Sequence, residues 1–141
     1  MSFTRHETPD EQDFYTALKT PQNVEVLEVG DLYDVEDNET QKYFYIKYKL
    51  VRTGQEQSVA YNVRFVDGEI IAPEGSKLFP LLSFVSGIED GEIHCLKSDI
   101  DEAVTGKTYR MKARKQKSKN VWYKLIPLEE ISKDGGDEFA V

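Results

Sequence analysis

Few residues of the chain have side chains suited to covalent catalysis. The two histidines are His6 and His94, and the single cysteine, Cys95, directly follows His94. Neighbouring residues of a strand point to opposite faces, so His94 and Cys95 would not form a nucleophile–base pair there. A free cysteine is usually a small core residue, and we interpret Cys95 in this way. The sequence has no phosphate-loop, dinucleotide-binding or nucleophile-elbow motif. We therefore expect no catalytic residue and no enzymatic activity.

The numbers of cysteines and histidines give little support for a metal site. One cysteine and two histidines are too few for a Cys/His zinc site, and one cysteine excludes an internal disulfide. We interpret the acidic residues Asp34, Glu36, Asp37 and Glu39 as a solvated loop, and we expect no metal and no other cofactor. Carboxylates that are distant in sequence can still share a divalent metal, so a metal-dependent nuclease or nuclease-associated domain is one alternative.

The basic residues are concentrated in one segment. Residues 105–128 hold eight basic and no acidic side chains, in a chain of 141 residues with a net charge of −8. Removing these eight from the 18 basic residues leaves 10 against 26 acidic residues, a net charge of −16. Surfaces selected only for solubility mix the two signs, whereas a basic segment in an acidic chain indicates a polyanion site.

The hydrophobic pattern predicts elements that could position these cations. Period-2 alternation predicts strands at 23–29, 42–51, 57–66, 107–116 and 120–128, and a short strand at 69–72. Helical spacing predicts a helix between an N-cap at Ser76 and a C-cap at Gly87, and Ser98 is predicted to cap a short helix at 100–104. Strands around one long helical connection favour a mainly β or α+β fold with a curved or barrel-like antiparallel sheet.

One face of each clear strand is apolar, and the other carries basic or aromatic side chains without acids. Cations bind phosphates, and aromatic rings stack on unpaired bases, so this face is typical of a platform for single-stranded nucleic acid. Outer aromatic residues can instead cover a helix or pair across strands. In the last strand, either Tyr123 and Leu125 or Trp122 and Lys124 could face inward. The candidate nucleic-acid-binding residues are Tyr43, Tyr45, Lys47, Lys49, Arg64, Lys107, Arg110, Lys112, Arg114, Lys115, Lys117, Lys119, Trp122 and Lys124.

The order of elements resembles that of small phage-type OB-fold proteins that bind single-stranded DNA. The stretches SKLFPLLSFVSGI and SDIDEAVTGKTYRMKARKQKSKNVWYKLIPLEEI give the order helix, Gly-Lys, basic strand, turn and aromatic strand. The resemblance covers residues 23–131 and implies an OB-like antiparallel barrel with one helical connection, a short second helix and a C-terminal basic hairpin. It also implies DNA binding without sequence preference, in replication or recombination. A homodimer is expected, and the residues themselves fit DNA and RNA equally.

The two ends of the chain are predicted to lie outside this domain. We expect residues 1–22 to form a flexible arm with about one helical turn, and residues 132–141 to form a flexible acidic tail. Asp137, Glu138 and Phe139 resemble the acidic tip through which bacterial single-stranded-DNA-binding proteins recruit replication and recombination enzymes. This tail lacks the continuous acidic run and the terminal Pro-Phe of that tip.

The hydropathy pattern predicts where the chain resides. No run approaches 18 apolar residues and the N-terminus has no apolar signal, so we expect a cytoplasmic protein with no membrane contact.

An alternative function of another class is that of a small structural or inhibitory phage-type protein that contacts a protein partner through its basic hairpin.

Overall fold

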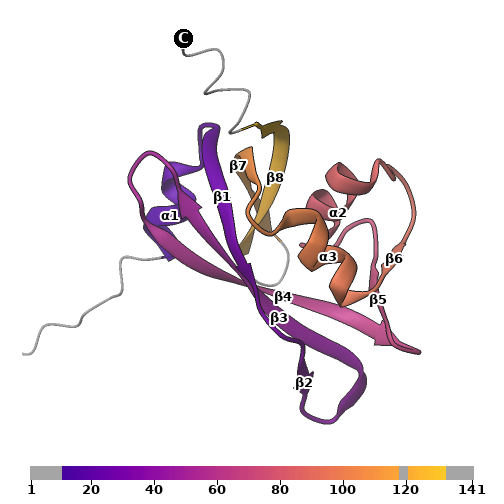
Figure 1. Cartoon of the computed structure of the whole chain (residues 1–141). Helices are drawn as coiled ribbons and strands as arrows, with labels where there is room; N and C mark the ends of the chain where they lie inside the picture. Colours follow the sequence, from indigo (N-terminus) through magenta and orange to yellow (C-terminus); the bar gives the residue numbers. More distant parts are fainter. Residues whose placement is uncertain (1–10, 118–120, 133–141) are drawn as a thin grey trace, which may run out of the picture.

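The computed structural model describes residues 11–117 and 121–132, and antiparallel strands make up most of this part. The strands are β1 (Gln22–Val29), β2 (Tyr33–Val35), β3 (Asn38–Leu50), β4 (Glu56–Val66), β5 (Glu69–Ala72), β6 (Ile93–Cys95), β7 (Thr108–Lys117) and β8 (Val121–Ile131). The helices are α1 (Glu11–Ala17), α2 (Phe79–Ser86) and α3 (Lys97–Val104). Figure 1 shows the sheet curling around one side of the core, with α2 and α3 on the other side.

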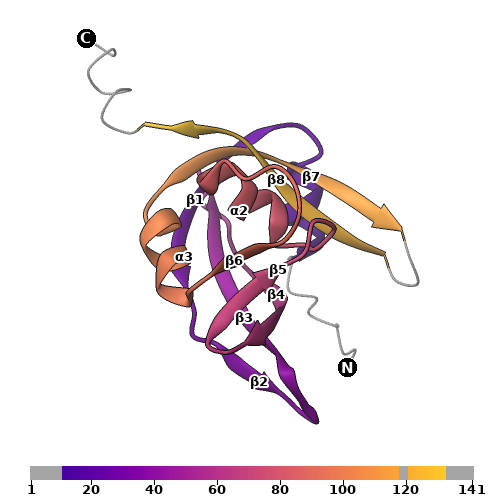
Figure 2. The same ribbon diagram turned by 90° about the vertical axis from the view of Figure 1, so that its right-hand side faces the viewer.

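The strands form one curled, half-barrel sheet. Their order is β6-β5-β4-β3-β1-β7-β8, every neighbouring pair is antiparallel, and β2 adds to β3 beside this path. The strands β6 and β8 form the two end edges of this path, and α2 contacts both of them. Figure 2 shows α2 between these two edges. The predicted class, a mainly β fold with a curved antiparallel sheet, is confirmed.

The core follows the predicted strand faces. Phe44, Ile46 and Tyr48 of β3 are fully buried, as alternation along a half-buried strand requires. Tyr109 and Met111 of β7 are also fully buried. The predicted apolar faces of these strands are therefore the core faces.

In β8, the face that carries Tyr123 and Leu125 points toward the core. Leu125 is 2% exposed and lies opposite Ala113, and Tyr123 packs against the core. Pro127 also lies in β8, and the register shifts at this point, where Met111 pairs with Pro127 and Arg110 with Glu129. Proline has no N–H for a ladder, and it is tolerated because β8 is an edge strand.

The first helix differs from the sequence expectation. Residues 11–17 form α1, and both Phe14 and Leu18 are fully buried. The Phe14 ring stacks on the Tyr48 ring, with 6.3 Å between the ring centroids. The Leu18 carbonyl accepts a hydrogen bond from the Ala113 N–H at 2.8 Å. Residues 11–22 are therefore part of the folded domain rather than a flexible arm, because Phe14 and Tyr15 of α1 and Leu18, just after it, are buried in the core.

The helix ends are partly as predicted. Gly87 ends α2 in the left-handed conformation, with φ of 77° and its N–H bonded to the Ser83 carbonyl, which confirms the predicted C-cap. The predicted N-caps are wrong. Helix α2 begins after Leu78, two residues beyond Ser76, and α3 begins at Lys97, where the Asp99 carboxylate accepts the Leu96 N–H at 2.8 Å. Asp99 therefore caps α3 from its third helical position, and Ser98 lies inside the helix.

Two short strands were not predicted. The strands β2 and β6 have three residues each, too few for a periodic pattern. Strand β2 lies in the segment predicted as a solvated acidic loop, and it forms a hairpin with β3 through Glu36 and Asp37. Asp37 adopts φ of 60°, a left-handed conformation that Asp tolerates in tight turns.

Candidate nucleic-acid interface

Three tyrosines form an exposed aromatic surface on β2 and β3, which we call the tyrosine platform: Tyr33, Tyr43 and Tyr45. Register places Tyr33 opposite Tyr43, and their rings stack at 5.4 Å between centroids. Tyr43 meets Tyr45 edge to face at 6.0 Å. Tyr33 is 49% and Tyr45 43% exposed, so large parts of both rings face solvent. The platform can offer aromatic faces to a ligand.

The neighbours of Tyr45 leave its ring uncovered. On the β4 side Tyr45 pairs with Ala60, and on the β1 side the Gly30 N–H donates to the Tyr45 carbonyl at 2.8 Å. Neither neighbour has a side chain long enough to cover a tyrosine. A Cβ at Gly30 would lie 3.2 Å from the Tyr45 carbonyl oxygen, so glycine also permits this close approach.

Three cations follow the outer face of β7, and we call them the basic stripe: Arg110, Lys112 and Arg114. All three are exposed, as is the neighbouring Lys115. Within residues 11–117 and 121–132, none of these four side chains takes part in an ion pair. The stripe therefore has no ion pair in the part of the chain that the structure describes, although the register places Glu129 opposite Arg110.

Lys124 adds a further cation beside the basic stripe. It lies directly opposite Arg114 in the β7–β8 ladder, and its ammonium group donates to the Gly75 carbonyl at 3.3 Å. Partial burial lowers the pKa of Lys124, and the nearby Arg114 charge lowers it further. Like charges directly opposite each other destabilise a strand pair, and a bound anion would relieve this repulsion.

The other predicted cations are held in ion pairs. Lys47 pairs with Glu56 at 3.2 Å, and Lys49 pairs with Glu25 at 3.4 Å. Lys107 lies 3.9 Å from Glu130. The outer face is thus not free of acids, contrary to the sequence expectation, because the neighbouring strands supply them.

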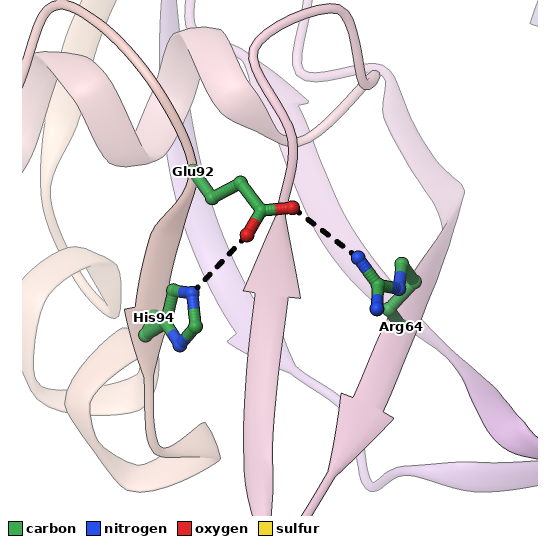
Figure 3. Close-up of polar contacts among 3 residues, drawn as sticks. All are labelled: Arg64, Glu92 and His94. Atoms are coloured by element: carbon green, nitrogen blue, oxygen red, sulfur yellow. Dashed lines mark hydrogen bonds and ion pairs between the residues drawn. The ribbon is translucent and has the colours of Figure 1, made fainter.

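Arg64 is paired in the same way. Its guanidinium donates to Glu92 at 3.2 Å, and the other oxygen of that carboxylate lies 3.4 Å from His94 (Figure 3). Glu92 precedes β6 and reaches β4 across the intervening strand β5. Sequence patterns within a single strand could not reveal this pairing.

The platform and the basic stripe lie on the same sheet face but at opposite ends of β1. Arg110 pairs with Asn23 near the start of β1, whereas Tyr45 lies beside Gly30, just after its end. At about 3.3 Å per residue, this separation is roughly 20–25 Å. The ion pairs of Lys47 and Lys49 lie between them. The structure therefore gives an extended path with an aromatic end and a basic end.

Several predicted residues cannot be placed in this path. Lys119 and the tail residues Asp137, Glu138 and Phe139 lie outside the described residues, and so do the side chains of Lys117 and Trp122. Tyr33 belongs to the platform but was not predicted. Its only sequence signal was an aromatic residue beside the acidic segment 34–39, which gave no indication of a strand.

The features that could indicate catalysis are weak in the structure. Cys95 is a free, half-buried thiol, and its pKa is raised to about 11 by burial and by the charges of Asp99 and Glu69. The thiol is therefore protonated at neutral pH and is a poor nucleophile. In the described part of the chain, no group of three or more His, Cys, Asp or Glu side chains could hold a metal ion.

The fold and the interface together define a mainly β protein whose curled sheet carries an aromatic platform and a basic stripe on one face. No family model matches the chain, and neither curated proteins nor solved structures give a match. None of the described helices has the length and apolar character needed to cross a membrane.

Proposed function

We propose that the protein binds single-stranded DNA without sequence preference, through an OB-type barrel. The observation that carries this proposal is the basic stripe: Arg110, Lys112 and Arg114 are exposed and lack ion pairs in the described chain, whereas Lys47, Lys49 and Arg64 are paired. An exposed row of like charges is costly to keep unless an anion neutralises it.

The strand order supports an OB-type barrel. The strands β1, β3 and β4 form a meander, a helical connection follows, and the hairpin β7–β8 returns to pair with β1. OB folds are partly open five-stranded barrels that bind oligonucleotides on the face of their second and third strands and on two connecting loops. In this protein the corresponding strands would be β3 and β4. The connection from β1 to β3 carries Tyr33, and the basic stripe leads to the connection between β7 and β8.

The platform and the basic stripe would contact different parts of the nucleic acid. Phosphates would contact the stripe and release counterions, which makes affinity depend on salt. Bases would stack on Tyr45 and its neighbours, which requires them to be unpaired and favours single strands over duplexes. Stacking does not read base edges, so little sequence preference is expected. Roles in phage replication or recombination, a homodimer and recruitment of enzymes by the tail are further parts of this proposal.

The direct test is a fluorescence titration of the protein with oligo-dT at low salt and at about 0.3 M salt. The proposal predicts saturable quenching of tyrosine and tryptophan emission and a weaker affinity at the higher salt concentration. An excess of duplex DNA of equal length should compete poorly. No quenching, for protein purified with a low 260/280 nm absorbance ratio, would reject nucleic acid as the ligand and favour a protein partner for the β7–β8 hairpin.

A further inference from the structure

An apolar cavity of about 150 Å³ opens between α2, β6 and α3. Its deepest residues are Leu82, Ile93 and Ile100, each at most 3% exposed. Val85, Cys95 and Ala103 form half-buried walls. Apolar concave sites of this kind accept apolar groups of a ligand.

Two exposed apolar side chains lie close in sequence to this lining. Leu96 follows Cys95 and is 49% exposed, and Ile88 lies two residues after Ser86 and is 43% exposed. Both side chains add exposed apolar surface to the segment of the chain that forms the cavity.

The segment of the chain that forms the cavity is strongly acidic. Residues 69–106 include eight acidic side chains and only two lysines. Lys97 pairs with Asp101, and Lys77 donates to the Ala60 carbonyl of β4. Asp99 is exposed and lines the cavity itself. Burial raises the pKa of Cys95, which also lines the cavity, and the charges of Asp99 and Glu69 raise this pKa further.

We propose that this cavity docks a short basic segment of another protein that carries one bulky apolar side chain. The apolar side chain would fill the cavity, and flanking lysines or arginines would lie near the exposed carboxylates of Glu89, Asp90 and Glu102. The same carboxylates repel phosphates, so nucleic acid is a poor occupant. The cavity and the basic stripe belong to different elements, and this docking site does not depend on the proposed function.

The experiment measures fluorescence anisotropy of a fluorescein-labelled KRKWKRK peptide with the full-length protein at moderate salt. We expect saturable binding, at least about tenfold weaker binding of KRKAKRK because the buried apolar group is lost, and no binding of EDEWEDE. Equal binding of KRKWKRK and KRKAKRK would overturn the proposal, because charge alone would then explain it. Absence of binding to KRKWKRK would overturn it as well.

Variants locate the site. Ala103→Leu fills the cavity and should weaken KRKWKRK binding at least about tenfold while oligo-dT binding is unchanged. If this variant fails to fold, the pair Glu89→Gln and Glu102→Gln provides the second test, because both side chains are exposed. The matched control is Glu28→Gln, an exposed acid on β1. If the cavity and rim variants bind KRKWKRK as the control does, the site lies elsewhere. Self-association that Ala103→Leu abolishes would identify a second copy as the occupant and also overturn the proposal.

Discussion

Tyr45 is the residue on which the stacking part of the account depends most. It is 43% exposed, and its strand neighbours are Gly30 and Ala60, which leave the ring open. Tyr45→Ala should lower oligo-dT affinity by about 1–3 kcal/mol, the range for loss of one stacked base. Tyr45→Phe keeps the ring and should bind as the wild type does, as measured by the same titration. Equal losses in both variants would assign the effect to the hydroxyl instead of stacking.

Tyr48 and Tyr61 test the account of the core. Their hydroxyls lie 2.6 Å apart, and both side chains are at most 1% exposed. Tyr48→Phe leaves the Tyr61 hydroxyl without this partner and should cost about 1–3 kcal/mol of unfolding free energy. The double variant Tyr48→Phe/Tyr61→Phe should cost less than the sum of the two single changes, in urea unfolding. Additive costs would mean that the hydrogen bond contributes little.

The same pair predicts how stability depends on pH. Burial raises the pKa of both tyrosines above 10, because it disfavours the phenolate. Above pH 10 the unfolded chain releases these protons while the folded protein retains them, so the free energy of unfolding falls as pH rises. The slope is on the order of 1.4 kcal/mol per pH unit for each tyrosine. Urea unfolding between pH 9 and 11 should show a shallower fall in the double phenylalanine variant, and equal falls would contradict this origin.

Among the elements, α1 contributes side chains to the core although the hydrophobic pattern of its sequence is weak. Phe14 is fully buried, and its ring centroid lies 5.6 Å from that of Tyr15 and 6.3 Å from that of Tyr48. Phe14→Ala should therefore lower the free energy of unfolding by about 3–5 kcal/mol in urea titrations. The matched control Thr16→Ala, at an exposed position of the same helix, should stay within about 0.5 kcal/mol of wild type. Similar small effects at both positions would show that α1 does not pack on the core.

The elements also show what the sequence could and could not predict. Alternation correctly assigned the core faces of β3, β4 and β7, because each strand has one clear apolar set. It could not predict the ion pairs of Lys47 and Lys49, since their partners come from adjacent strands whose register is a property of the folded sheet. Tyr33 was missed for the same reason: β2 has three residues, and only its pairing with β3 brings Tyr33 onto Tyr43.

Across the whole molecule, the fold determines which basic side chains lie beside acidic ones, and a count of charges in the sequence does not show this. The acidic excess neutralises most of the cations on the β3–β4 face, whereas the basic stripe on β7 keeps its charge. The overall charge of −8 disfavours indiscriminate association with polyanions and leaves this stripe as a local positive site.

The most direct test of the central claim compares how salt affects oligo-dT affinity in two matched double variants. Each phosphate contact contributes roughly 0.7 to the slope of log affinity against log salt for single strands. Arg110→Ala/Lys112→Ala should therefore flatten the slope by about 1.4, because both cations are unpaired in the described chain. Lys47→Ala/Lys49→Ala removes cations that are already paired and should change the slope much less. Equal changes in the two variants, or an unchanged slope in the first, would contradict phosphate binding by the basic stripe.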